Sequence, residues 1–248
     1  MSLYVIADLH LSINENTGKS MEVFGPRWRD YVPKLEKRWR AVINPTDTVV
    51  IPGDISWAMT LEEALPDLRF IDSLPGRKIL GKGNHDFWWS TATKMQNFLK
   101  QAELSTIDIL YNNAFETEDF ILCGSRGWFN DEAQQKTVGA VNPDYQKIIR
   151  REVIRLKMSL DAGVALAKSA PHAKEILVFL HFPPVFGGFL CREIVDLLQE
   201  YQIKNCFYGH IHGNYFVPRT ISFEGMDFVI TSSDFLNFSP MPILPSQR

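Results

Sequence analysis

Short apolar runs that end in polar residues recur along the chain. They cover residues 3–7, 48–51, 78–80, 120–123, 176–180, 205–208 and 228–231. The runs are rich in β-branched and aromatic side chains and are too short for buried helices, so they predict buried strands. Longer stretches between them repeat apolar residues at steps of three and four, which is typical of amphipathic helices. These helices are expected over residues 31–43, 61–71, 91–99, from 142–143 to beyond 160, and 189–201.

This alternation of strands and helices predicts an α/β fold. Thr60 and Glu63 form a capping box at the start of the second helix, whereas Pro66 predicts a kink there or two short helices. Residues 12–20 and the proline-rich tail 239–248 are expected to be irregular. We find no repeat and no low-complexity linker, so we expect a single domain over residues 1–248.

The composition narrows the class of function. The chain is 45% hydrophobic and 22% charged, which is typical of a globular protein, and its formal net charge is −3. A duplex-binding protein usually carries a basic excess, so duplex nucleic acid is not an expected partner. Cys123, Cys191 and Cys206 form no C-x-x-C pair and are odd in number, which favours a reducing compartment. We see neither a membrane span nor a signal peptide, and we expect a cytoplasmic protein.

Polar residues follow five of the predicted strands in a regular order. The segments are Asp8-Leu9-His10, Gly53-Asp54, Gly83-Asn84-His85-Asp86, His181 and Gly209-His210-Ile211-His212. Ligand sites in open α/β sheets lie beyond the carboxyl ends of strands, so these side chains are expected on one face of the molecule. On an extended segment, residues two apart point to the same side, which suits chelation by the first and last segments.

Each of these segments also has an ordinary explanation when it is taken alone. Gly53-Asp54 and Gly83-Asn84 are common turn sequences, and His181 suits a hydrogen-bonded histidine of the core. A tripeptide such as Asp8-Leu9-His10 often arises by chance. The occurrence of all five segments in this order, each after a strand, favours a metal site.

The ordered series resembles the motifs of the calcineurin-like metallophosphoesterase superfamily, from Asp8 to His212. The resemblance implies a four-layer sandwich of two packed mixed β-sheets flanked by helices, with the metal site at the carboxyl ends of the strands. It also implies the following residue roles. The first metal would be held by Asp8, His10 and His212, the second by Asn84, His181 and His210, and Asp54 would bridge the two.

The resemblance further implies that His85 is the catalytic histidine and that Asp86 orients it. An adjacent carboxylate can fix the tautomer of an imidazole and raise its pKa. The implied reaction is in-line attack of a metal-bridging hydroxide on a small phosphomonoester or phosphodiester. Which ester type and which oligomeric state apply stay open.

The ligand types support a site for two divalent metal ions. Imidazole and carboxylate ligands suit Mn²⁺, Fe²⁺, Zn²⁺, Co²⁺ or Ni²⁺, and we favour Mn²⁺. Two such ions bring four positive charges, whereas Asp8, Asp54 and a hydroxide return only three negative ones. The neutral side chain of Asn84 therefore leaves the centre net positive and suited to a phosphate.

The sequence departs from particular branches of the superfamily. In protein phosphatases an Asp-Arg pair follows the bridging aspartate, whereas Asp54 is here followed by Ile55-Ser56-Trp57-Ala58. Trp57 stands where purple acid phosphatases carry a tyrosine that ligates iron. The chain looks more like the small, single-domain bacterial phosphohydrolases. A nuclease for short single-stranded nucleic acid is an alternative enzyme. A metal-free interaction scaffold is the alternative from another class, but scaffold members typically lose ligands.

Four further residues are candidates for substrate binding. Arg27 and Arg126 are candidate phosphate anchors, with solvated surface arginines as the alternative. Trp57 and Trp88 are candidate pocket walls for an apolar or base-like group, with burial in the core as the alternative. A small phosphorylated compound is the expected partner, and no membrane is expected to take part.

Overall fold

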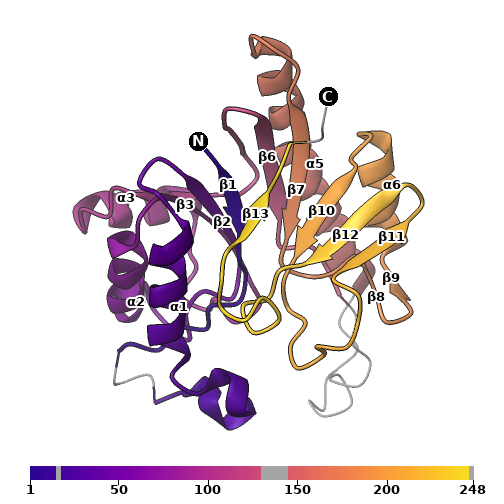
Figure 1. The fold of residues 1–248 in the computed structure, drawn as a ribbon. Helices are drawn as coiled ribbons and strands as arrows, with labels where there is room; N and C mark the ends of the chain where they lie inside the picture. Colours follow the sequence, from indigo (N-terminus) through magenta and orange to yellow (C-terminus); the bar gives the residue numbers. More distant parts are fainter. Residues whose placement is uncertain (15–17, 130–144, 246–248) are drawn as a thin grey trace.

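The computed structural model describes residues 1–14, 18–129 and 145–245, and two large β-sheets run through it (Figure 1). The first sheet has the strand order β13-β1-β2-β3-β4. Its strands are β1 (Leu3–Val5), β2 (Thr48–Pro52), β3 (Arg77–Gly81), β4 (Ile107–Ile109) and β13 (Met241–Ile243). Strands β1 to β4 are parallel to one another, and β13 is antiparallel to β1.

The second sheet has the strand order β11-β12-β10-β7-β6-β5. Its strands are β5 (Ala114–Glu116), β6 (Phe120–Ser125), β7 (Glu175–Leu180), β10 (Asn205–Tyr208), β11 (Thr220–Phe223) and β12 (Met226–Ile230). The four central strands are parallel, and the two edge strands β5 and β11 are antiparallel to their neighbours. A separate hairpin joins β8 (Val185–Phe186) to β9 (Phe189–Leu190).

Helices lie against the outer face of each sheet (Figure 1). Those beside the first sheet are α1 (Tyr31–Val42), α2 (Leu61–Ser73) and α3 (Ala92–Gln101), and those beside the second are α5 (Tyr145–Ser169) and α6 (Arg192–Glu200). Two short 3-10 helices, η2 (Met21–Phe24) and η3 (Pro26–Trp28), precede α1. Sequence periodicity did not indicate them, because three or four residues are too few to show a period.

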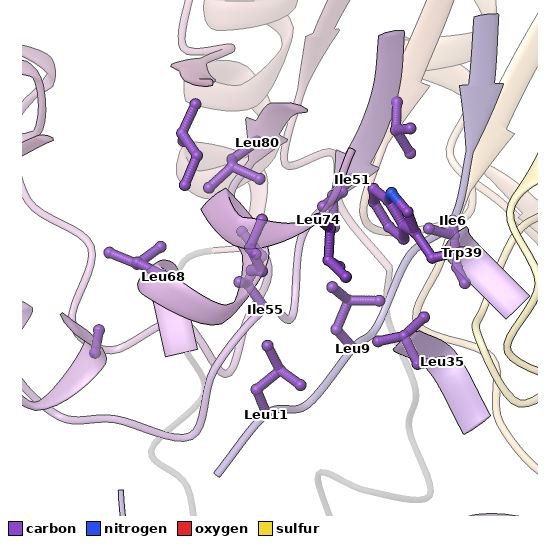
Figure 2. Close-up of a cluster of buried hydrophobic side chains, with 14 of the residues drawn as sticks. Ile6, Leu9, Leu11, Leu35, Trp39, Ile51, Ile55, Leu68, Leu74 and Leu80 are labelled. Carbon is purple, nitrogen blue, oxygen red and sulfur yellow. The ribbon is translucent and has the colours of Figure 1, made fainter. Parts of the chain in front are cut away.

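The alternation of side chains along the central strands builds the layers. In β2, Val49 and Ile51 belong to a cluster that contains Trp39 of α1, and Figure 2 shows Ile51 and Trp39. Val50 lies in a second cluster that also contains Phe179 of the other sheet. Successive residues of a strand point to opposite faces, so this strand is buried on both sides. The second cluster is therefore the core between the two sheets.

The second sheet likewise packs one of its faces against helices. Val178 and Leu180 of β7 pack with Leu156 of α5 and Ile194 of α6. Tyr208 of β10 belongs to the same cluster and is fully buried, as its apolar neighbours in the sequence indicated. The order helix, sheet, sheet, helix confirms the predicted four-layer sandwich with mixed sheets.

Most predicted elements are present, with differences at their ends. All seven predicted strands form, although residues 6–7 lie beyond β1 and residue 231 lies beyond β12. Helix α2 is continuous through Pro66, so the prediction of two short pieces is wrong. The missing amide of Pro66 costs one hydrogen bond, and burial of Ala64, Leu68 and Ile71 on one face holds the helix together. The predicted start of the fourth helix at 142–143 lies outside the described residues.

Two expectations about local structure are wrong. The helix predicted over 189–201 begins at Arg192, because Gly187 and Gly188 adopt positive φ and turn the chain into the β8–β9 hairpin. The tail expected to be irregular contains β13, in which Pro242 pairs with Tyr4. Proline is tolerated there because β13 is an edge strand and needs hydrogen bonds on one side only.

The two sheets meet where their parallel strands end. The amide of Ala7 donates to Thr231 O at 2.8 Å, and the amide of Ser233 donates to Ala7 O at 2.9 Å. The chain after β1 is thereby fixed beside the chain after β12, although they are far apart in sequence. In the described part of the chain, none of the helices has the length and apolar character needed to cross a membrane.

Candidate metal centre

The segments that follow the parallel strands carry a cluster of histidine and carboxylate side chains. Asp8 follows β1, Asp54 follows β2, Asn84 and His85 follow β3, His181 follows β7, and His210 and His212 follow β10. Because both sheets end on the same side, these residues of distant segments come together. The cluster forms two groups.

The first group contains Asp8, His10 and His212. One potential ligand atom from each lies within 4.8 Å of the others. The two imidazoles face each other closely, with His10 Nε2 3.1 Å from His212 Nε2. These are the three residues that the sequence resemblance assigns to a first metal.

The second group contains Asp54, His181 and His210, whose potential ligand atoms also lie within 4.8 Å of one another. The amide oxygen Oδ1 of Asn84 lies 2.6 Å from His181 Nε2, which places Asn84 beside this group. The group therefore holds the three residues assigned to the second metal, together with the assigned bridge.

Asp54 belongs to the second group and also reaches the first. Its Oδ2 is 3.6 Å from His10 Nε2 and 3.5 Å from His181 Nε2. Its Oδ1 accepts a hydrogen bond of 2.8 Å from the amide of His85, which fixes the orientation of the carboxylate. One carboxylate oxygen is thus within reach of both groups, as a bridging ligand requires.

The backbone at these residues is left-handed, so the expectation of extended segments is wrong. Asp8, His10, Asp54 and His210 have φ values of 59°, 45°, 51° and 69°. This conformation is costly for residues other than glycine, and it tends to be kept at functional sites. Sharp turns are needed here because the chain must reverse after each strand to bring its side chains to a common point.

Hydrogen bonds and glycines hold these turns. The amide of Asp8 donates to Gly53 O at 3.0 Å, and the amide of His10 donates to Asp54 O at 2.9 Å. A Cβ atom at Gly83 would collide with Oδ1 of Asp54, and one at Gly209 would lie 2.6 Å from Oδ2 of Asp8. The two glycines thus allow the backbone to approach the two carboxylates.

The protonation of the cluster suits a divalent cation. Burial raises the pKa of Asp8 to about 6, and burial with the nearby charges of Asp86 and Asp8 raises the pKa of Asp54 well above its usual range. Burial and the neighbouring histidines lower the pKa values of His10 and His181. A cation would offset the buried negative charge, and neutral imidazole is the form that binds metals.

Unpaired polar atoms point to the same conclusion. Within the described part of the chain, Asp8 Oδ1, His10 Nδ1 and His181 Nδ1 are buried without a hydrogen-bond partner. Buried polar atoms are rarely left without partners, because each costs the free energy of its lost hydration. Carboxylate and imidazole donors in this arrangement fit divalent transition metals.

Comparison with known proteins identifies the family. The family model described as calcineurin-like phosphoesterase matches residues 1–214. The chain belongs to this family. It is accordingly a phosphoesterase, of a kind that uses divalent metal ions, and the sequence resemblance is confirmed. None of the curated proteins matches the chain.

Solved structures share the fold at low sequence identity. One is the phosphopantetheinyl hydrolase PptH from Mycobacterium tuberculosis, with a TM-score of 0.55 and 15% identity over 99% of this chain and 96% of that chain. Another is TT1561 of Thermus thermophilus, with a TM-score of 0.58 and 10% identity over 94% of this chain and 89% of that chain. At these identities the likeness concerns the fold alone.

The hydrogen bonds described for Asp86 in this phosphoesterase do not include one to the ring of His85, so its expected role in orienting that ring stays a prediction. Its carboxylate accepts hydrogen bonds from the amides of Gly83, Asp54, Ile55 and Ser56 and from Trp88 Nε1. These donors occupy both oxygens. Asp86 therefore holds the turns after β2 and β3 together through their backbone amides.

A cavity of about 330 Å³ lies above the two groups, and His85 and Trp57 are among the residues that line it. Burial and the nearby charges of His212 and Lys19 lower the pKa of His85 to about 4, so the expectation that Asp86 raises this pKa is wrong. The centroid of its ring lies 4.4 Å from that of Trp57, and Trp57 in turn stacks on His10 at 4.9 Å. Trp57 is thus at the cavity wall, as the sequence suggested.

Trp88 does not line the cavity, in contrast to the expectation from the sequence. Its side chain is 2% exposed, packs in the core beside the first sheet, and donates to Asp86 Oδ1 at 3.1 Å. The core alternative is therefore the correct one for Trp88, and its contact with the centre is indirect.

The two arginines lie beside the centre, but both already bind protein groups. Arg27 donates to Asp234 O at 2.8 Å and stacks on the ring of Tyr215 at 3.6 Å. Arg126 lies 3.6 Å from Glu152 Oε1, and its carbonyl accepts the amides of His181 and Phe182. Arg27 is an exposed residue, whereas the side chain of Arg126 is half-buried. Their role as phosphate anchors stays a prediction.

Asp234 is a residue that the sequence reading missed. Its Oδ1 lies 2.9 Å from His212 Nδ1, and its Oδ2 accepts hydrogen bonds from the amide of Gly213 and the hydroxyl of Tyr215. A carboxylate at Nδ1 fixes the tautomer that leaves Nε2 available to a metal. The sequence does carry a signal for Asp234, because this residue is the last of a polar segment that follows the predicted strand 228–231.

Replacing Asp234 with asparagine should weaken metal binding by the first group roughly 10- to 100-fold, the usual effect of losing a carboxylate behind a histidine ligand. The affinity for Mn²⁺ can be measured by isothermal titration calorimetry. Asp47→Asn is a matched control, because Asp47 is also buried and accepts backbone amides, but from Ser2 and Asn44. Unchanged affinity in Asp234→Asn would contradict the assigned role.

Proposed function

We propose that this phosphoesterase hydrolyses a small phosphomonoester or phosphodiester with two divalent metal ions bound together, Mn²⁺ being the favoured ion. The observation that carries the proposal is the position of Asp54 Oδ2, about equally far from a histidine of each group, at 3.6 Å and 3.5 Å. Two ions that share one carboxylate can clamp a phosphoryl group between them.

The residues of the centre would have the following roles. Asp8, His10 and His212 would hold one ion, and Asn84, His181 and His210 the other, with Asp54 shared. When bound, the ions would supply an activated water and neutralise charge on the phosphoryl oxygens. His85 lies at the cavity wall, where it can donate a proton to the leaving oxygen.

The lowered pKa of His85 is compatible with this role once substrate binds. The value of about 4 belongs to a histidine buried among other histidines and near Lys19. A bound phosphate dianion favours the imidazolium form, because an opposite charge within a few ångströms raises the pKa of an imidazole. Binding of the substrate would thereby favour the protonated form of His85, which is the proposed general acid.

The proposal is tested by metal content and turnover. Protein reconstituted with Mn²⁺ should retain two ions per chain after gel filtration, as measured by inductively coupled plasma mass spectrometry. It should then hydrolyse members of a panel of phosphomonoesters, phosphodiesters and nucleotides, and lose this activity with a chelator.

Retention of one ion or none would contradict the dinuclear centre. Turnover of single-stranded oligonucleotides alone would favour the nuclease alternative, and no turnover with two bound ions would contradict the phosphoesterase assignment to this centre.

A further inference from the structure

The cavity above the two ligand groups has an apolar wall for which the proposed chemistry has no use. The cavity has a volume of about 330 Å³. His10, Asp54, His85, His210 and His212 line its base, and the other lining residues are Met21, Phe24, Trp28, Trp57, Gly213 and Tyr215. A phosphoryl group alone needs contact with the base only.

The inner part of this wall is firmly held. Met21 and Trp28 are 4% and 1% exposed. The Trp28 ring packs edge-on against His212 at 5.5 Å and against Phe238 at 5.2 Å. Ser20 caps η2, and Gly25, with φ of 125°, makes the turn from η2 to η3. The short helices are thus fixed against the metal centre.

Phe24 differs from the rest of the wall. Its side chain lines the cavity but is 67% exposed, so the ring lies at the mouth with little protein against it. Its neighbour Val23 is 80% exposed and is not among the cavity-lining residues. An uncovered aromatic ring at the rim of a cavity is typical of a ligand-binding surface.

The wall lies beside the proposed proton donor. The ring centroid of Trp57 is 4.4 Å from that of His85, so a group attached to the oxygen that His85 protonates would lie against Trp57. The rings themselves offer no free hydrogen-bonding group to a ligand, because the Tyr215 hydroxyl already donates to Asp234 and Trp57 Nε1 is buried. Lys19 Nζ and the Arg27 guanidinium lie over the rings of Trp57 and Tyr215, at 4.6 Å and 3.6 Å from the centroids, and a flat aromatic ring can pack beside them without a hydrogen-bond partner.

The size of the cavity agrees with a leaving group of this kind. Small-molecule sites usually begin at about 300 Å³, so this cavity accepts more than an inorganic phosphate but not a large ligand. We propose that the wall formed by Phe24, Trp57 and Tyr215 is a leaving-group site for phosphoesters that carry one flat aromatic ring next to the ester oxygen. This inference rests on the proposed function, since it takes the phosphoryl group to bind at the two ligand groups.

Binding of non-hydrolysable phosphonates tests the inference without turnover. Phenylphosphonate should bind the Mn²⁺-loaded protein about tenfold more tightly than methylphosphonate, the effect expected from burying much of one ring. Calorimetry gives both dissociation constants, and quenching of tryptophan fluorescence gives a second readout from Trp28 and Trp57. Phe24→Ala should reduce the preference to about threefold, because part of the ring contact remains.

Val23→Ala is the matched control, since it removes an exposed apolar side chain one residue away and outside the cavity. It should retain the full preference for the phenyl compound. Equal binding of the two phosphonates, or an unchanged preference in Phe24→Ala, would overturn the inference and leave the phosphoesterase function untouched. A preserved preference without turnover of any phosphoester would instead contradict the proposed function.

A further arm distinguishes the two sources of a flat ring. Uridine and adenosine monophosphates should be compared with phenyl phosphate, with and without Phe24. Tighter binding of phenyl phosphate that depends on Phe24 supports an aryl ring next to the ester oxygen. Tighter binding of a nucleotide would overturn the inference, because the ribose of a nucleotide separates its base from the ester oxygen.

Discussion

Replacement of Asp54 with alanine should remove both metal ions at once and reduce hydrolysis to background. Asp54 Oδ2 lies between His10 and His181, so neither group keeps its shared oxygen in the variant. The remaining ligands would hold each ion with one donor fewer and without the charge of the bridge. Elemental analysis after reconstitution with Mn²⁺ should give much less than one ion per chain, and turnover should fall to the background of the assay, because both the activated water and the charge neutralisation depend on the ions.

A second readout separates loss of metal from loss of fold. An ion that binds only the folded protein raises the melting temperature, so Mn²⁺ should stabilise the wild type but not Asp54→Ala. Asp67→Ala is the matched control, because Asp67 is also buried and accepts hydrogen bonds from Ser56 Oγ and the amide of Ile13. The control should lose about 1–3 kcal/mol of stability and keep both ions. Two ions at full occupancy in Asp54→Ala would disprove the shared ligand.

Replacement of His85 with alanine should leave the metal content unchanged and lower kcat by roughly 10²- to 10⁴-fold for esters with poor leaving groups, the usual range for general acid catalysis. The defect should shrink for a nitrophenyl ester, because a nitrophenolate leaves without a proton. The acid must be protonated to act, so kcat of the wild type should fall as the pH rises above the pKa of His85 in the substrate complex. That limb of the pH profile should be absent from His85→Ala.

His172→Ala controls for the loss of an imidazole elsewhere in the protein. His172 is exposed and its Nε2 lies 3.0 Å from Glu118 O, away from the ligand groups. This variant should retain wild-type kcat on both esters. An equal loss on poor and good leaving groups in His85→Ala would show that proton donation is not its role, and would favour direct stabilisation of the phosphoryl charge.

The arrangement of the centre was predictable from the sequence because its signals are local. Each strand appears in the sequence as a short apolar run, and each ligand follows its strand within a few residues. The order of the apolar runs therefore largely determines the order of the ligands. The parallel sheets then bring these ends together. Asp54, for example, is an ordinary turn residue until β1 and β3 are placed on either side of β2.

Features that depend on contacts between distant segments were not predictable in this way. Asp234 reaches His212 because β12 and β10, which are not consecutive in the chain, lie side by side in the second sheet. The hydrogen bonds of Asp86 come from two separate turns, so the sequence motif could not show that its oxygens face amides. The apolar wall was missed for a similar reason, since Met21 and Trp28 acquire a role only through their position above the centre.

The two ligand groups draw their members from both sheets. In the first group, Asp8 and His10 come from the first sheet and His212 from the second; in the second group, Asp54 comes from the first sheet and His181 and His210 from the second. Ions held in this way would cross-link the two sheets, in addition to the hydrogen bonds that Ala7 makes with Thr231 and Ser233. Removal of the metal should therefore lower the free energy of unfolding of the whole sandwich as well as the activity, because an ion that binds only the folded chain stabilises it.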